Sequence, residues 1–267
     1  MHPILFKIPI FGGIPIATYG LLVAVAFLIG NFWVRYESKR LGDNPETASD
    51  LIFWIILSGL AGSRMLYHNV AEPSRYFSKP LVFFKFWEGG LVFYGGFIAA
   101  AIGGSYFCYR HRLRVLKYFD IVAPALSLGH AVGRVGCFFA GCCFGRPTHD
   151  HPWYAVIFPE IAEGRAPAGI PLYPTQLMES GAELIIFGFL LWLRLRKKFD
   201  GQIFVTYVML YAIVRSIIEI FRGDLDRGFI IDPWLSTSQF ISLILFLIGA
   251  FIYWAKWSPK ISEGKHL

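Results

Sequence analysis

The sequence predicts an all-α polytopic membrane protein with seven transmembrane helices, its N-terminus outside the cell and its C-terminus in the cytoplasm. Of the 267 residues, 55% are hydrophobic and 16% are charged, and the mean hydropathy is +0.52. In a water-soluble domain, about a quarter of all residues are usually charged. The aromatic content of 18% also excludes intrinsic disorder, because disordered chains have few aromatic side chains. Composition therefore favours a chain that lies in a membrane.

Seven apolar stretches have a length suited to crossing a bilayer, for which a helix needs about 20 predominantly apolar residues. Three of them carry no charged residue and cover 16–34, 89–109 and 234–255. Four more are interrupted by polar or ionisable groups and run roughly over 48–67, 120–143, 176–193 and 202–221. Each stretch is expected to be one helix.

Lys and Arg are distributed unevenly between the segments that connect these stretches. The chain has 25 basic and 18 acidic residues, a net charge of +7. In a soluble protein this excess could indicate a nucleic-acid partner, but in a membrane protein it more often marks cytoplasmic loops. Fourteen basic residues follow the first, third, fifth and seventh stretches, and eight lie in the opposite segments. This asymmetry predicts the orientation and argues against nucleic acid as a partner.

The predicted outward segments are the longer ones, at about 71–88 and 141–175. Both contain Pro, Gly and aromatic residues, so we expect partly ordered caps instead of flexible linkers. The simplest interpretation of the whole chain is one membrane-embedded domain over residues 1–267.

Polar and ionisable side chains inside three of the stretches recur at the spacing of a single helix face. They are His130, Arg134 and Cys137 in the fourth stretch, Gln176, Glu179 and Glu183 in the fifth, and Tyr211, Arg215, Glu219 and Arg222 in the sixth. Such groups are costly in lipid and usually face a bundle interior or a water-filled cavity. For the glutamates, interhelical ion pairs such as Arg215 with Glu179 or Glu219 are the simpler interpretation. On its own helix, Arg134 has only the distant Asp120.

Two of these arginines are predicted to lie at the same depth. Arg134 and Arg215 each follow the cytoplasmic start of their stretch by 14 residues, roughly 21 Å along an α-helix. Tyr19 and Tyr94 lie near the outer ends of stretches that run the other way. One layer in the outer half of the membrane can therefore hold all four. Arginine binds phosphate oxygens in pairs and stays charged when desolvated, which suits a receptor for a lipid phosphate.

Several segments resemble those of the bacterial prolipoprotein diacylglyceryl transferases. The most specific is residues 133–145, GRVGCFFAGCCFG, with its Gly-Arg pair and spaced glycines at the outer end of a predicted helix. Further segments match in order along nearly the whole chain: ATYG at 17–20, GSR at 62–64, GGLVFYGG at 89–96, DIVAP at 120–124, YPTQLME at 173–179, YAIVRSIIEIFR at 211–222 and LSTSQ at 235–239.

The resemblance implies a multi-pass enzyme of the bacterial inner (plasma) membrane, with its active site toward the periplasmic or outer half. It would transfer the diacylglyceryl group of phosphatidylglycerol to the thiol of the lipobox cysteine in a prolipoprotein. The products would be a thioether and glycerol phosphate, in the first step of lipoprotein maturation. The expected partners are therefore phosphatidylglycerol, prolipoprotein signal peptides and membrane lipid, and no cofactor is expected.

The resemblance also gives roles to individual side chains. Arg134 and Arg215 correspond to essential arginines of the family, and we expect both to be catalytic. The positions that matter for activity or substrate binding correspond to Tyr19, Gly145, Tyr211 and Glu219. In the expected reaction, a thiolate attacks the glyceryl carbon that carries the phosphate ester. The two arginines would hold the phosphate and stabilise charge on the leaving group.

Three positions depart from the usual pattern of the family. Tyr94 stands where the motif of the third stretch often has a histidine, and Cys137 and Cys142 replace an asparagine and an acidic residue. A mechanism that needs that histidine or that carboxylate does not transfer to this chain. We assign Tyr94 a hydrogen-bonding or proton-relay role in catalysis. His130, one turn from Arg134, is a candidate substitute base, and the alternative is a packed histidine bonded to a carbonyl group.

Cysteines near the end of the fourth stretch suggest a different chemistry. Cys137, Cys142 and Cys143, followed by His149 and His151, could indicate a zinc or redox site. Their spacing contains no Cys-x-x-Cys pair, and adjacent cysteines rarely bind one metal together. We therefore expect no metal, and buried small residues at a helix end are the simpler interpretation. A disulfide is the remaining alternative.

Two other classes of protein compete with a transferase. A transporter or channel would line a pathway with the Arg and Glu residues, but it predicts inverted repeats and broken helices in matching halves. Seven stretches and a single signature argue against that class. A structural scaffold leaves two arginines at matched depth without an explanation.

Overall fold

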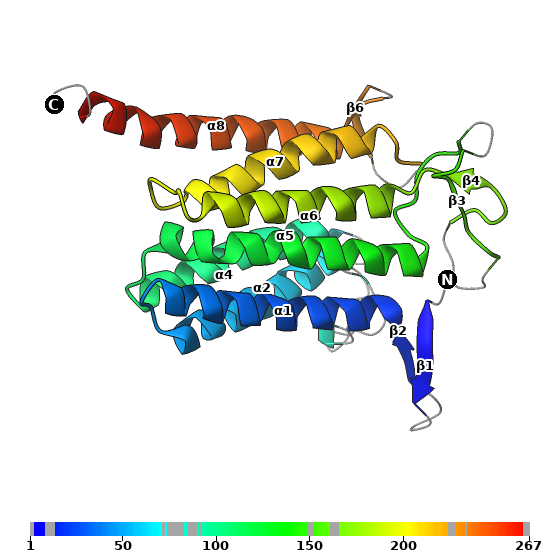
Figure 1. Ribbon diagram of the computed structural model, residues 1–267. Coiled ribbons are helices and arrows are strands. Elements are labelled where there is room, and N and C mark those ends of the chain that lie inside the picture. Colours follow the sequence, from blue (N-terminus) through cyan, green and yellow to red (C-terminus); the bar gives the residue numbers. More distant parts are fainter. Residues whose placement is uncertain are drawn as a thin grey trace. The chain divides into compact units, whose positions relative to one another are not determined.

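The computed structural model describes residues 3–8, 14–70, 73, 83–84, 90, 92–148, 152–160, 166–223, 228–232 and 234–263. This part of the chain is mainly helical, which confirms the predicted helical class (Figure 1). Its long helices are α1 (Thr18–Arg40), α2 (Pro45–Val70), α4 (Phe93–Arg110), α5 (Val115–Ala140), α6 (Thr175–Leu193), α7 (Gln202–Glu219) and α8 (Thr237–Glu263). The predicted cap at 71–88 lies almost entirely outside the described residues, whereas the one at 141–175 is largely described.

Six of these helices, all except α4, have the length and composition to cross a bilayer. α4 corresponds to the expected span at 89–109. Four glycines and three tyrosines lower its hydropathy. The structure thus supports a multi-pass membrane protein, while the seventh span and the orientation stay predictions.

Three short antiparallel hairpins accompany the helices in the described ranges, and the sequence analysis did not predict them. They pair β1 (Ile4–Ile8) with β2 (Ile14–Ala17), β3 (Val156–Ile157) with β4 (Pro171–Leu172), and β5 (Phe229–Ile231) with β6 (Leu235–Ser236). Each hairpin leads within three residues into a long helix, namely α1, α6 or α8. They therefore cap helix N-termini.

The chain divides into two compact units, residues 33–118 and residues 1–32 with 119–267. In the first unit, α2 and α4 pack through small residues. A Cβ atom at Gly62 or at Gly95 would lie 2.5 Å from the carbonyl oxygen of the other glycine. Close packing of this kind is typical of helix pairs in membranes. The buried Arg64 donates to the carbonyls of Phe83 and Gly90, each at 3.2 Å, so this arginine has contacts within its own unit.

In the second unit, one buried carboxylate joins the start of α5 to the start of α7. Asp120 Oδ2 accepts hydrogen bonds from Gly201 N at 2.8 Å and Lys197 Nζ at 3.1 Å, and Oδ1 accepts from Phe204 N at 3.0 Å. A negative charge is favourable at a helix N-terminus, where backbone N–H groups lack helical partners. Asp120 therefore holds the two helix starts in register.

Further polar bonds join α5 to α6. Ser127 Oγ and Ser180 Oγ lie 2.7 Å and 2.9 Å from carbonyl oxygens of the opposite helix. The same three helices, α5, α6 and α7, also share an apolar cluster of buried side chains, namely Ala123, Ile186, Leu190, Ile203 and Tyr207. Half of the apolar part of α5 is buried, against 11% for α8. α5 is therefore the inner helix of this unit, and its side chains are the ones expected to line a site.

Candidate functional site

Arg134, in the last third of α5, is bound by side chains of α5 and α6. Its Nη2 atom lies 2.9 Å from Glu179 Oε1, and its Nε donates to His130 Nε2 at 3.1 Å. The side chain is 14% exposed and Glu179 is 2% exposed. The carboxylate that Arg134 lacks on its own helix thus comes from α6. An arginine has five N–H donors, so donors remain for a ligand.

Arg215 occupies the corresponding place on α7. Its Nη2 lies 2.7 Å from Glu219 Oε2, so Glu219 is the partner, one of the two ion pairs expected from the sequence. Within the part of the chain that the structure describes, Nη1 of Arg215 is buried and has no hydrogen-bond partner. Leaving a buried donor of a charged group unpaired is costly. This donor is therefore suited to an acceptor on a ligand.

Glu179 joins the two arginines into one site, since its carboxylate interacts electrostatically with both Arg134 and Arg215. The Asp120 contact explains why they meet at one level. From Asp120 to Arg134 and from Gly201 to Arg215 the chain advances 14 residues, roughly 21 Å on each helix. This equal spacing from a shared contact agrees with the equal depth expected from the sequence, which stays a prediction.

His130 lies between two carboxylates and an aromatic ring. Its Nδ1 is 3.2 Å from Glu183 Oε1 and its Nε2 is 3.4 Å from Glu179 Oε1. The ring contacts Tyr211 with centroids 5.2 Å apart. Because Arg134 Nε donates to Nε2, that nitrogen is the acceptor and Nδ1 carries the proton toward Glu183. In this arrangement His130 positions Arg134, and its role as a base stays a prediction.

Tyr19 and Tyr211 border the site from α1 and α7. A Cβ atom at Gly136 would lie 3.0 Å from Tyr19 Cδ2, so this glycine lets Tyr19 approach α5 closely. Tyr19 interacts electrostatically with Arg134 and with the neighbouring cysteines. The structure therefore brings Tyr19, Arg134, Arg215, Tyr211 and Glu219 to one region of the second unit.

Gly145 belongs to a backbone brace that follows the C-terminal end of α5. Its N–H donates to Tyr173 O at 3.2 Å, and Arg146 N donates to Phe221 O at 2.8 Å. A Cβ atom at Gly145 would lie within 2.5 Å of the Tyr173 carbonyl and side chain. The loop after α5 thus passes between the start of α6 and the end of α7, and this closeness gives the glycine a structural role.

The structure does not place Tyr94 relative to the other predicted site residues. It lies in the first turn of α4, in the unit of residues 33–118, and its side chain is outside what the structure describes. Its place beside the arginines stays a prediction. His149 and His151 also lie outside the described residues.

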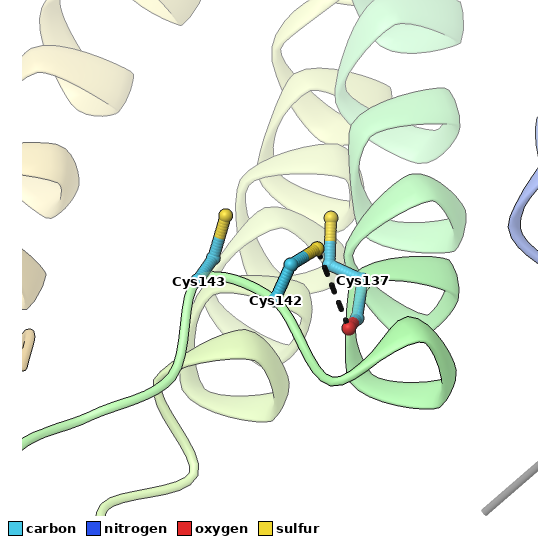
Figure 2. Close-up of side chains that lie close together, drawn as sticks. All are labelled: Cys137, Cys142 and Cys143. Atoms are coloured by element: carbon cyan, nitrogen blue, oxygen red, sulfur yellow. Dashed lines mark hydrogen bonds between the residues drawn. The ribbon is translucent and has the colours of Figure 1, made fainter. Parts of the chain in front are cut away.

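The three cysteines after Arg134 lie together (Figure 2). The sequence analysis named them as a possible zinc or redox site but favoured buried small residues at a helix end. Their sulfur atoms are all within 4.8 Å of one another, and all three thiols are free. Cys142 Sγ lies 3.7 Å from Cys137 O. The clue in the sequence is Gly141, which ends α5 with φ +65° and turns the chain back.

Comparison with known proteins assigns the chain to a family. Residues 3–255 match the model of the prolipoprotein diacylglyceryl transferases. Three relatives carry the name phosphatidylglycerol–prolipoprotein diacylglyceryl transferase. That of Clostridium tetani is 34% identical over 253 residues, 95% of this chain and 97% of the relative. That of Legionella pneumophila is 34% identical over 261 residues, covering 96% and 97%. That of Bordetella bronchiseptica is 33% identical over 250 residues, 91% of each. The chain therefore belongs to the prolipoprotein diacylglyceryl transferase family.

Proposed function

We propose that the chain transfers the diacylglyceryl group of phosphatidylglycerol to the lipobox cysteine of a prolipoprotein, forming a thioether and releasing glycerol phosphate. The observation that carries this proposal is the pair of largely enclosed arginines, 14% and 11% exposed, each with a carboxylate partner. Among the described residues, one buried donor of Arg215 has no hydrogen-bond partner. The names of the relatives supply the substrates. The arginines supply a receptor for the phosphate that those substrates require.

Phosphate binding follows from the donors that the ion pairs leave over. Arg215 Nη1 and the remaining donors of Arg134 can bind two oxygens of the phosphodiester. Glu179 and Glu219 fix the two guanidinium groups before the lipid arrives. Charged donors that are already oriented stabilise charge without reorganising during the reaction.

In the reaction, the thiolate sulfur of the substrate attacks the glyceryl carbon that bears the phosphate. The carbon–oxygen bond breaks and its electron pair stays on the phosphate oxygen, so negative charge grows beside Arg134 and Arg215. Glycerol phosphate leaves as a monoester and takes up the proton that the thiol lost. Tyr19 and Tyr211 border the lipid and peptide, and Tyr94 contributes a hydrogen bond or relays a proton.

The proposal includes a membrane placement. α4 is the seventh span, the N-terminus is outside, and the enzyme lies in the bacterial inner membrane as one domain over residues 1–267. The basic residues after α1, α4, α6 and α8 support this orientation. The Asp120 end of α5 then faces the cytoplasm, and Arg134 and Arg215 lie in the outer half. Lipid and signal peptide meet there on the side where a prolipoprotein presents its cysteine.

The test uses purified protein in vesicles of phosphatidylglycerol with a synthetic lipobox peptide. We expect the mass of one diacylglyceryl group to be added to the peptide, and no addition to a peptide in which the cysteine is replaced by serine. Arg134→Ala should abolish the addition, while Arg196→Ala, an exposed arginine on Trp192 near the far end of α6, should leave it unchanged. Wild-type protein that leaves the cysteine peptide unmodified would exclude the function.

A further inference from the structure

The three-thiol cluster of Cys137, Cys142 and Cys143 has the dimensions of a metal site. A zinc ion bound to thiolates at about 2.3 Å in tetrahedral geometry separates its sulfur ligands by about 3.8 Å. The three sulfurs already lie within 4.8 Å of one another. They therefore need to approach by at most about 1 Å to bind one ion. A disulfide needs two of the sulfur atoms at about 2.05 Å from each other. Starting from a separation of up to 4.8 Å, this requires a larger movement than zinc binding does.

The backbone around the cluster is held in place by both neighbouring elements. Cys142 N donates to Cys137 O at 3.1 Å, which closes the end of α5. From α6, Gln176 Nε2 and Thr175 Oγ1 donate to the carbonyls of Cys142 and Cys143 at 2.8 Å and 2.9 Å. The three thiol-bearing residues are thus fixed before any ion binds, and a site fixed in advance loses little conformational freedom on binding.

Cys143 adopts a backbone conformation that is unusual for its residue type. Its φ is +57°, in the left-handed region that favours glycine. Such outliers persist where the surrounding structure imposes them, and they concentrate at functional sites. Figure 2 shows the result, with all three sulfur atoms on the same side of the loop.

The charges near the cluster suit three thiolates around a divalent ion. Three thiolates and one Zn²⁺ have a net charge of −1, and Arg134 and Arg222 both interact electrostatically with Cys143. Arg134 also precedes Cys137 by three residues on α5, which places the two side chains on neighbouring turns. Thiolate sulfur is a soft ligand that selects zinc or copper(I) over magnesium or calcium.

We propose that Cys137, Cys142 and Cys143 bind one zinc ion, whose fourth coordination position takes the thiol of the prolipoprotein cysteine. This inference rests on the proposed function, because it requires a substrate thiol beside Arg134. Three protein ligands with one exchangeable position are the pattern of catalytic zinc sites, and a thiol that coordinates zinc is deprotonated. His130 is not needed as the base, which agrees with the engagement of its Nε2 by Arg134.

The step balances without a further reactant. The substrate thiol binds zinc and releases its proton to water. The zinc-bound sulfur then forms the bond to the glyceryl carbon while the carbon–oxygen bond breaks. The electron pair leaves with the phosphate oxygen, which takes a proton from water. The thioether product is a weaker zinc ligand than a thiolate, so the next substrate thiol can replace it.

The first part of the test measures metal binding without turnover. Reduced full-length protein in detergent should bind about one zinc per chain and give the visible absorption of tetrahedral thiolate coordination with Co²⁺. Cys142→Ser should bind at least about tenfold more weakly, since even changes beyond the direct ligands weaken metal sites by about 10- to 100-fold. The matched control is Cys108→Ala, a buried cysteine of α4 outside the cluster. Zinc should also protect the cluster thiols of the wild type from a thiol reagent, a measurement that needs no variant.

The second part tests the fourth position. Adding the lipobox peptide to the cobalt protein should shift its spectrum, and the peptide with serine in place of cysteine should leave it unchanged. Wild-type protein with reduced thiols that binds no more zinc than Cys142→Ser overturns the proposal, and so does a cobalt spectrum that is insensitive to the cysteine peptide. Metal-free protein should transfer about 10- to 30-fold more slowly, because a free thiol of pKa about 8.5 is only about 3% thiolate at pH 7. Undiminished transfer by metal-free protein overturns the role of zinc in activating the substrate thiol and leaves the proposed function intact.

Discussion

Arg215→Lys isolates what the guanidinium group of Arg215 does beyond carrying a positive charge. In the wild type, the buried Glu219 carboxylate lies 2.7 Å from Arg215. A lysine at position 215 can keep an ion pair with this carboxylate. It cannot reproduce the planar fork or the unpaired Nη1 donor. The variant therefore keeps the charge of the site and removes one donor that we assign to the substrate phosphate. Alanine would also leave the Glu219 carboxylate without its ion pair and would mix folding with catalysis.

The magnitude follows from the energy of one hydrogen bond to a charged group. Such a bond contributes about 1.5–3 kcal/mol, and 1.4 kcal/mol corresponds to a tenfold change in rate, so kcat/KM should fall about 10- to 150-fold. The fall should be present at saturating phosphatidylglycerol, because the donor acts on charge that grows in the transition state.

The assay is the initial rate of diacylglyceryl addition to the lipobox peptide over a range of phosphatidylglycerol contents. Arg196→Lys, at an exposed position near the other end of α6, is the matched control and should keep the wild-type rate. A thermal midpoint in detergent close to that of the wild type is the check that Arg215→Lys remains folded. A folded Arg215→Lys enzyme within about threefold of the wild-type kcat/KM would contradict the reasoning, since about 0.65 kcal/mol is too little for a charge-assisted bond.

Three further outcomes follow from contacts in the second unit. Asp120→Asn should lower the free energy of unfolding by about 2–4 kcal/mol, seen as a lower thermal midpoint, because a buried charge that accepts two backbone N–H bonds is lost. The Asp200 carboxylate also binds Lys197 but is more exposed, so Asp200→Asn should lower the free energy of unfolding by less than about 1 kcal/mol. Equal shifts of the thermal midpoint in the two variants would contradict the role of Asp120 as an anchor between α5 and α7. Gly145→Ala should cost about 1–3 kcal/mol by overpacking against Tyr173, whereas Gly181→Ala, with open space around its Cα, should not destabilise the fold. His130→Gln should reduce kcat/KM by about tenfold through a misplaced Arg134 while the pH–rate profile keeps its shape; a displaced profile would instead make His130 the base.

Helix positions could be predicted closely from the sequence, because length and apolarity are local properties. The stretch expected at 176–193 is α6 (Thr175–Leu193), and that at 202–221 is α7 (Gln202–Glu219). The hairpins were missed because their strands have two to five residues, too short for a periodic pattern. α4 shows the limit of apolar length alone, since its glycines serve the contact with α2 and lower its hydropathy.

The site was predictable in kind but not in its pairings. The one-sided spacing on α5 and α7 indicated that Arg134 and Arg215 face inward, and both do. The partner of Arg134 is 45 residues away on α6, and the anchor of Asp120 is 81 residues away at Gly201. Contacts across such separations depend on how helices pack, which no local pattern records. The three cysteines were named together from the sequence, but their close approach could not be predicted, because it depends on positive φ at Gly141 and Cys143.

The anchor between Asp120 and the start of α7 has a consequence for biogenesis. Asp120 leaves the ribosome 81 residues before Gly201, which at about 5–20 residues per second is a delay of roughly 4–16 s. During that interval α5 lacks the backbone amides that later donate to its carboxylate. Under the orientation that we propose, Asp120 lies at the cytoplasmic end of α5, where water can solvate the charge. Only after the start of α7 is synthesised can the two arginines come to one level. The nascent chain therefore has no complete receptor for lipid phosphate until its sixth predicted span has been inserted, so catalytic competence is acquired late in synthesis.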